Sequence, residues 1–239
     1  MSLKHILARP EIVDGITLHP VLVEDYDDFS ECSRFLYLSK DAFGETPLTL
    51  MDLVLGVYEQ LGETVESYLT KICRTFEIIT KCSVGFIPGK DLSSFVIDEK
   101  YYISEVNYDT IRNIIMKQNL MFEPKKYKDP IVQEWADKVV AVRSKKQGHT
   151  TLEDMITTVK AYQGVSYEQI SKQSIYQLYA DFFRICKIVN FEQSSLFSTV
   201  SSEKITIEYF AQNINLFVEG DPYKDVFMDG GFLNQFNKF

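Results

Sequence analysis

Residues 150–178 read TTLEDMITTVKAYQGVSYEQISKQSIYQL, and this stretch indicates the class of the fold more clearly than any other. Thr150 and Glu153 have the spacing of a capping box, in which two side chains satisfy backbone N–H groups in the first turn of a helix. The apolar residues that follow recur at steps of three and four, as they do on the buried face of a helix. These residues are Leu152, Met155, Ile156 and Val159.

Two more helices are predicted in and beyond the same stretch. Gly164 predicts the end of the first helix, because glycine readily adopts the left-handed conformation of a helix terminus. Ser166 and Gln169 form a second capping box that opens a short helix. Ser174 then precedes a long helix that continues toward Phe197. Its apolar face contains Leu178, Phe182, Ile185, Cys186 and Val189.

The N-terminal half mixes two periodicities. Asp14-Gly15 is a turn dipeptide inside residues 11–23, so we expect a short edge strand or hairpin there. Short β-prone runs between residues 84 and 104 predict further strands, at Phe86-Ile87, Phe95–Ile97 and Tyr101–Ile103. Helical spacing predicts helices over about 24–38, 47–61 (opened by Thr46-Pro47), 65–81, 107–118 and 129–145.

These patterns predict an α+β protein that is predominantly helical. Its N-terminal part is α/β with short antiparallel strands, and its C-terminal part is helical. The polar stretch Arg143–Gly148 places the internal boundary. We therefore expect a mixed α/β domain over residues 1–145, a helical domain over 146–218, and a tail rich in Gly, Asn and Phe over 219–239.

Composition excludes several classes of function. The 239 residues carry a net charge of −9, with a pI of about 4.9, whereas nucleic-acid binding normally requires a basic surface. No apolar run approaches the roughly 20 residues of a membrane span. The N-terminus lacks the apolar core of a signal peptide, and the four cysteines form no C-x-x-C pair. We expect a cytoplasmic protein that binds neither nucleic acid nor membrane.

No motif in the chain predicts a catalytic, cofactor-binding or metal-binding residue. Gly85–Asp91 has one residue too few between its glycines for a phosphate-binding loop, and Asp91 replaces the required Ser or Thr, so a Pro-Gly turn is the better interpretation. The acidic run Glu24–Asp28 lacks the pattern of a calcium loop and suits a helix N-terminus. The histidines are far apart in sequence, at His5, His19 and His149.

The C-terminal tail combines residues that resist ordering with large apolar side chains. Each phenylalanine could contribute roughly 1.5–3 kcal/mol when fully buried. Such a segment commonly docks on its own domain or on a partner, and the sequence leaves both open. The predicted partner-binding residues are Phe227, Phe232, Phe236 and Phe239.

Several stretches resemble proteins that assemble the tails of long-tailed bacteriophages. Ile16–Val21 followed by Glu24–Phe29 is similar to the start of tail-module proteins, which have a strand and then an acidic helix with Tyr and Phe. Thr151–Ile156, Gly164–Ile170 and Ser174–Leu178 resemble the C-terminal helical part of tail assembly chaperones. Together these stretches contain 30 of the 239 residues.

The resemblance implies a small, non-enzymatic factor that works in the cytoplasm of the host bacterium. Tail assembly chaperones are thought to coat the tape-measure protein and to bring tail-tube subunits to it. The implied partners are therefore the tape-measure protein and the tail-tube protein, and a homo-oligomer is also possible. Two alternatives remain open: a structural component of a phage or prophage particle, and an enzyme whose site is dispersed in the sequence.

Overall fold

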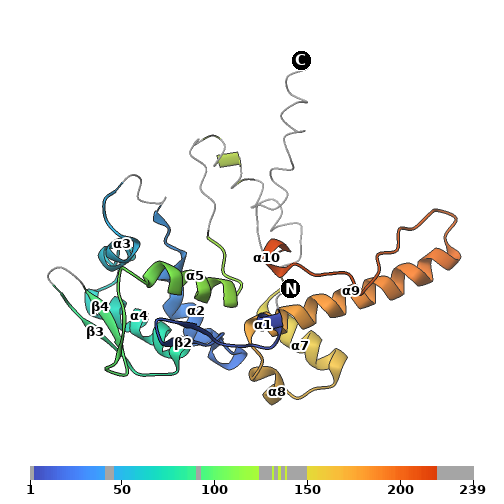
Figure 1. Cartoon of the computed structure of the whole chain (residues 1–239). Helices are drawn as coiled ribbons and strands as arrows, with labels where there is room; N and C mark the ends of the chain where they lie inside the picture. Colours follow the sequence, from blue (N-terminus) through green and yellow to red (C-terminus); the bar gives the residue numbers. More distant parts are fainter. Residues whose placement is uncertain are drawn as a thin grey trace.

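The computed structural model describes residues 3–40, 46–89, 93–123 and 150–219, together with isolated positions between 131 and 138. The fold is α+β and mainly helical, which confirms the predicted class. Strands lie in the N-terminal half and the C-terminal half is helical (Figure 1). The expected helix over 129–145 and the tail beyond residue 219 lie almost wholly outside the described residues. The expected boundary near residue 145 lies there too, and it stays a prediction.

The predicted N-terminal hairpin is confirmed. Strands β1 (Glu11–Val13) and β2 (Ile16–Leu18) pair antiparallel, with Asp14 and Gly15 between them. Gly15 has a φ of +82°, and a Cβ placed on it would lie 2.6 Å from the ring of Tyr101. The turn therefore requires glycine both for its backbone conformation and for the close approach of the aromatic ring.

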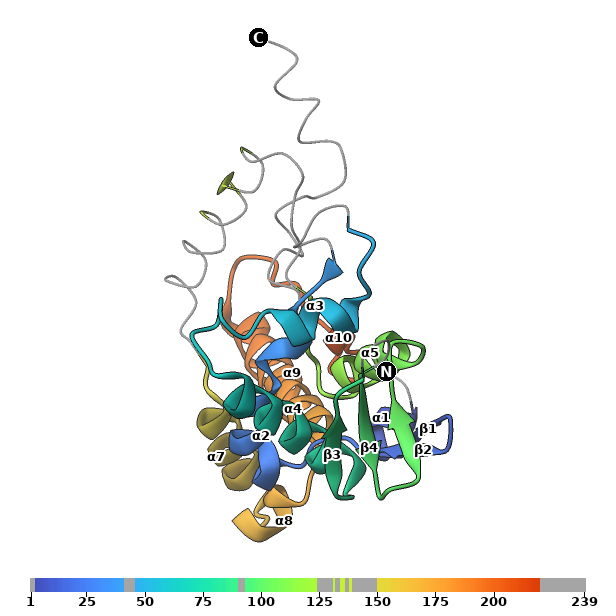
Figure 2. The ribbon, with the colours of Figure 1, turned by 90° about the vertical axis from the view of Figure 1, so that its left-hand side faces the viewer.

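The predicted strands of the middle region form one antiparallel sheet in the order β3-β4-β5. These strands are β3 (Val84–Ile87), β4 (Ser94–Ile97) and β5 (Tyr101–Ile103). The sheet lies on the side of the molecule that faces the viewer in Figure 2. Phe86 pairs with Phe95, and Phe95 pairs with Ile103, so these three side chains share the face that packs on the core.

The helix expected over 24–38 is interrupted. It consists of the 3₁₀ turn η1 (Val23–Asp25), the helix α2 (Tyr26–Cys32) and the 3₁₀ turn η2 (Ser33–Tyr37). Ser33 leaves the α-helical conformation, with φ −90° and ψ 8°. The helical spacing predicts Leu36 on the buried face, and the tighter turns bury it together with Phe35, which the spacing does not predict.

The helix expected over 47–61 was predicted wrongly at both ends. Helix α3 spans Leu50–Gly56. Thr49 is its N-cap: its hydroxyl accepts a hydrogen bond from Asp52 N at 3.2 Å, and the Asp52 carboxylate accepts one from Thr49 N at 3.1 Å. This reciprocal capping box starts the helix three residues after Thr46. Leu61, expected on the buried face, is exposed.

The remaining helices follow the predictions closely. Helices α4 (Val65–Thr80) and α5 (Tyr108–Gln118) lie where helical spacing placed them. In the C-terminal half, α7 (Leu152–Gln163) begins at Thr151, which forms a capping box with Asp154, so the predicted pair Thr150 and Glu153 is wrong by one residue. The second capping box and the end at Gly164 are confirmed. The other C-terminal helices are α8 (Tyr167–Ser171), α9 (Ile175–Val200) and α10 (Leu216–Glu219).

One large core and two smaller clusters hold these elements together. The large core lies between the sheet and helices α2 to α5. At its centre three rings are in contact at steep angles: the centroid of Phe76 lies 6.0 Å from that of Phe35 and 5.2 Å from that of Phe95. The smaller clusters lie along α9. One packs α9 against α7 and α8, and the other packs it against α1 (Leu3–Ile6) and α10.

A short backbone seam joins the two halves of the chain and sets the start of α9. Val23 N donates to Gln173 O at 2.9 Å, and Ile175 N donates to Val21 O at 3.0 Å. Val21 N in turn donates to the side-chain oxygen of Asn119 at 2.8 Å. The segment after β2 is thus held from both sides, by α5 and by the first turn of α9.

Candidate protein-interaction surface

The first half of α9 is built into the body of the protein. Ser174 is fully buried and caps the helix by accepting a hydrogen bond from Gln177 N at 3.2 Å. Leu178 and Ile185 pack with α7, while Tyr176 and Ala180 pack with Ile214 and Leu216.

Although α9 has 26 residues, no helix in the described ranges is long and apolar enough to cross a membrane.

The second half of α9 extends away from the body, and the chain returns along one side of it (Figure 1). Arg184 donates to the carbonyl oxygens of Phe210 and Gln212. Lys187 lies 3.8 Å from the carboxylate of Glu208. The ring of Phe191 lies 5.3 Å from that of Phe210. These contacts cover one face of the helix as far as Phe191.

The opposite face is left open at the end of the helix. Leu196, Phe197 and Val200 are 67%, 60% and 77% exposed. We call these three residues the α9 end face. Leu196 and Val200 are one helical turn apart, and Phe197 lies beside them, so the three form one contiguous apolar patch. The patch continues the line of Ile185 and Val189, which α7 covers nearer the body.

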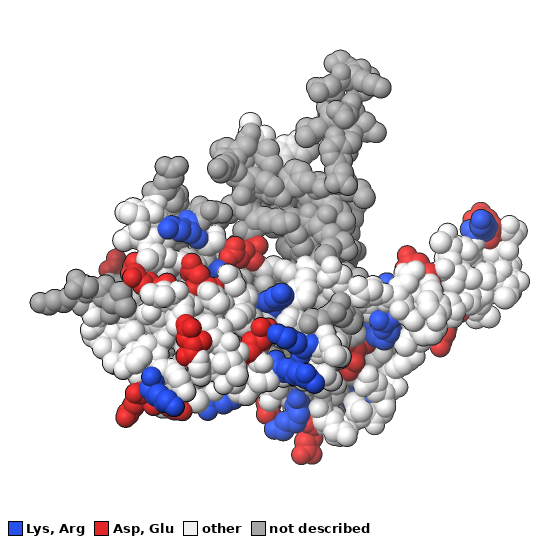
Figure 3. Space-filling model, in the orientation of Figure 1, with Lys and Arg blue, Asp and Glu red and all other residues white. Residues whose placement is uncertain are grey.

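The α9 end face is also almost free of charge. From Ile188 to Val200 only Glu192 is charged. In the space-filling view the projecting arm is largely white, with charged side chains toward its base and its tip (Figure 3). Single exposed apolar residues are common on any protein, but three together on an uncharged helix end are typical of a protein-binding surface.

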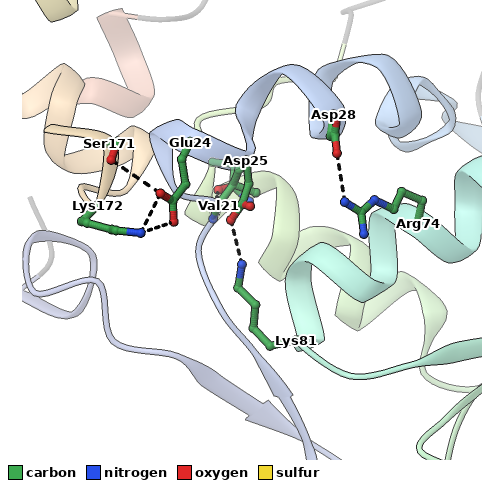
Figure 4. Close-up of polar contacts among 9 residues, drawn as sticks. Val21, Glu24, Asp25, Asp28, Arg74, Lys81, Ser171 and Lys172 are labelled. Carbon is green, nitrogen blue, oxygen red and sulfur yellow. Dashed lines mark hydrogen bonds and ion pairs between the residues drawn. The ribbon is translucent and has the colours of Figure 1, made fainter. Parts of the chain in front are cut away.

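The acidic run Glu24–Asp28 has a structural use. Glu24 pairs with Lys172 of the segment before α9 at 2.7 Å. Two further pairs join the run to the α4 region: Asp25 with Lys81 at 2.8 Å, and Asp28 with Arg74 at 2.9 Å (Figure 4). Its carboxylates therefore pair with cations on two different segments, in addition to standing at the start of a helix as expected. The part of the chain that the structure describes contains no group of three His, Cys, Asp or Glu side chains placed to hold a metal.

Two of the histidines, His5 and His19, make contacts that belong to the packing of the fold. The ring of His5 lies 5.2 Å from Tyr176 and 5.6 Å from Phe217, and burial lowers the pKa of its imidazole. His19 donates its backbone N–H to Ile79 O at 2.8 Å, and burial lowers its pKa as well. His149 lies outside the described residues. Gly85 lies within strand β3, while the end of the loop-like motif at Lys90 and Asp91 is not described.

The thiols should differ strongly in reactivity. Burial raises the pKa of Cys73 to about 11. Partial burial also raises the pKa of Cys186, but its side chain is exposed on α9, whereas that of Cys73 is not. At pH 8 we expect a disulfide reagent such as Ellman's reagent to modify Cys186 at least about tenfold faster than Cys73, because the thiolate is the reacting species and must be accessible. Peptide mapping of partly modified protein measures both rates. Faster modification of Cys73 would contradict the packing of α4.

The exposed apolar patch that the structure describes lies on α9 and not in the tail that was predicted to bind a partner. Phe227, Phe232, Phe236 and Phe239 lie outside the described range, so their role stays a prediction. The sequence predicts a long helix that continues toward Phe197, and its apolar spacing does not separate the exposed end from the buried part. A usable signal was present: the drop in charged residues after Lys187, in a helix that already had a buried face nearer its start.

Comparison with known proteins relates the chain to a prophage. It is 29% identical over 122 residues to the SPbeta prophage-derived uncharacterized protein YomV of Bacillus subtilis (strain 168). That match covers 51% of this chain and 51% of YomV, so the chain spans about half the length of the curated relative it matches. No solved structure matches. A family described as the YomV second domain matches residues 144–215, the region that contains α7, α8 and α9. The two matches support a phage or prophage origin and do not specify a role in tail assembly.

Proposed function

We propose that this protein is a non-enzymatic assembly factor of a phage or prophage. It binds the tape-measure protein, the tail-tube protein or both during tail assembly. The similarity to a prophage-derived protein supports the phage or prophage origin. The observation that carries the binding role is the α9 end face, an apolar and nearly uncharged surface at the end of a helix that projects from the body.

The chemistry of the α9 end face favours an apolar helical partner. An amphipathic helix buries its apolar residues against a complementary apolar surface at steps of three and four residues. Leu196 and Val200 offer that spacing, and Phe197 supplies an aromatic side chain of the kind enriched in binding hot spots. A strongly charged partner would instead lose solvation on this face without gaining an ion pair.

The size of the face indicates weak contacts that are repeated many times. A stable one-to-one interface buries about 800 Å² on each partner, whereas a large aromatic side chain buries roughly 150–250 Å². Three side chains, of which only Phe197 is aromatic, therefore fall well short of a standard interface. Several copies bound along one long partner would gain the remaining affinity through avidity.

Substitution of the α9 end face should break the complex without unfolding the protein. We expect Leu196→Ser, Phe197→Ser and Val200→Ser together to weaken co-purification with the tape-measure or tail-tube protein at least about tenfold, because each side chain loses apolar burial worth about 1 kcal/mol or more. Co-expression and quantitative pull-down measure this. The matched control carries Ser at three other exposed apolar positions, Leu3, Ile12 and Val106. Equal binding by both triple variants would end the proposal.

Two further experiments test the C-terminal tail and distinguish an assembly chaperone from a structural component of the particle. A chain that ends at Glu219 lacks the four predicted phenylalanine anchors and tests the tail independently of α9. Mass spectrometry of purified particles distinguishes a chaperone from a structural component, since a chaperone is absent from the finished particle and a component is present.

A further inference from the structure

Strand β3 leaves one edge of the three-stranded sheet open. The opposite edge is covered: on β5, Tyr102 O accepts a hydrogen bond from the Asn107 side chain at 3.0 Å, and the ring of Tyr101 lies against Gly15. On β3, no hydrogen bond beyond those to β4 is found among the described residues. Native proteins usually blunt such an edge with charge, proline or a covering element.

The open edge presents a defined set of backbone groups. Asp98 N donates to Ser83 O at 3.1 Å, so Ser83 is hydrogen-bonded to the residue opposite it. Hydrogen-bonded and non-hydrogen-bonded pairs alternate along an antiparallel ladder. Gly85 and Ile87 therefore also bond toward β4, while Val84 and Phe86 direct their N–H and C=O groups outward.

The core-facing side chains of β3 are less buried than those of β4 and β5. On the inward face of β4, Phe95 and Ile97 are 1% and 2% exposed, and Ile103 of β5 is fully buried. On the same face of β3, Val84 and Phe86 are only half-buried, although both pack against the core. A further strand beside β3 would complete their burial.

Gly85 has no explanation within the single chain. Its φ is not in the left-handed region, and a Cβ placed on it would meet nothing within 4 Å. Glycine in the interior of a strand costs roughly 0.5–1 kcal/mol relative to alanine. Such a glycine often marks a place where another backbone approaches closely.

We propose that β3 pairs antiparallel with β3 of a second copy of this chain. The two-fold axis passes beside Gly85, so that Val84 of each copy forms a hydrogen-bonded pair with Phe86 of the other. This arrangement satisfies all four outward groups of each strand and joins two sheets into one of six strands. Gly85 then faces its own counterpart in a non-hydrogen-bonded pair, where Cα atoms come within about 4.5 Å.

A second copy fits this edge because the edge is complementary to itself. The outward groups are placed symmetrically about Gly85, and a two-fold contact requires that symmetry. The strand is also uncharged from Cys82 to Gly89. Two chains of net charge −9 can therefore meet here without local repulsion. The surface is separate from the α9 end face, so this dimer does not depend on the proposed function.

The mass in solution tests the pairing. Light scattering coupled to size exclusion should give twice the 27.7 kDa chain mass for the wild type. Gly85→Lys should halve that mass, because it places two like charges directly opposite each other across the axis. The control Ser94→Lys puts the same charge on the same outer face of the neighbouring strand β4, and it should leave the dimer intact. A monomeric wild type, or a dimer that survives Gly85→Lys, would overturn the proposal.

A cross-link gives an independent readout that does not depend on losing the dimer. Disulfides join residues whose Cα atoms are 4.4–6.8 Å apart, which includes the expected Gly85 pair. In a Cys186→Ser background, which removes the exposed thiol, Gly85→Cys should form a covalent dimer with oxidised glutathione, and Ser94→Cys should not. Absence of the Gly85→Cys dimer, or equal cross-linking at both positions, would contradict the two-fold arrangement.

Discussion

Phe76→Ala should lower the free energy of unfolding by about 3–5 kcal/mol, the largest loss we expect from a single substitution in this chain. Phe76 on α4 is fully buried and lies between Phe35 of η2 and Phe95 of β4. Removing its ring leaves a cavity where a helix, a 3₁₀ turn and the sheet meet. Urea unfolding followed by circular dichroism measures the loss.

The same truncation at an exposed aromatic residue provides the control. Phe197→Ala removes the same ring from the α9 end face and should change the free energy of unfolding by less than about 0.5 kcal/mol. Similar losses at the two positions would show that the cluster of rings around Phe76 is not the centre of the core.

Asn119→Leu should cost about 1–3 kcal/mol, although leucine is similar in size and more apolar. The side-chain oxygen of Asn119 accepts the hydrogen bond from Val21 N at 2.8 Å, and Val21 is fully buried. Leucine leaves that N–H without a partner in the core. Because Val21 O also accepts from Ile175 N, the substitution should loosen the start of α9 as well.

Hydrogen exchange and urea unfolding together measure this effect. The amide of Ile175 should exchange faster in the Asn119→Leu variant, and the unfolding midpoint should fall. Asn190→Leu makes the same chemical change at an exposed position of α9 and should do neither. A stable Asn119→Leu variant with unchanged exchange at Ile175 would contradict the structural role of the seam.

Local signals predicted much of the fold. Capping boxes and apolar spacing located α8, α4, α5 and the long α9, because a helix of that length repeats its pattern several times. The errors lay at helix ends. Thr46-Pro47 has the residue types of a helix start, but the reciprocal hydrogen bonds between Thr49 and Asp52 begin the helix three residues later. From its sequence, Ile205-Thr206-Ile207 is compatible with a strand or a helix, and in the structure it adopts neither.

The candidate surface could not be predicted in the same way, because exposure depends on the end of a neighbouring helix. The apolar stripe of α9 runs from Leu178 to Val200 with a break at Glu192 and Gln193. Whether each part is buried depends on α7, which covers Ile185 but leaves Leu196 open. The seam between Val21 and Ile175 joins residues 154 positions apart, which no local pattern could indicate.

We propose that this protein acts on other proteins through the end of α9. Hydrogen exchange of the free protein and of its complex with the tape-measure or tail-tube protein tests this without altering the chain. We expect peptides covering residues 191–200 to become at least about tenfold more protected in the complex, while the Glu24–Lys172 region is unchanged. Protection elsewhere with no change at residues 191–200 would show that the α9 end face is not the binding site.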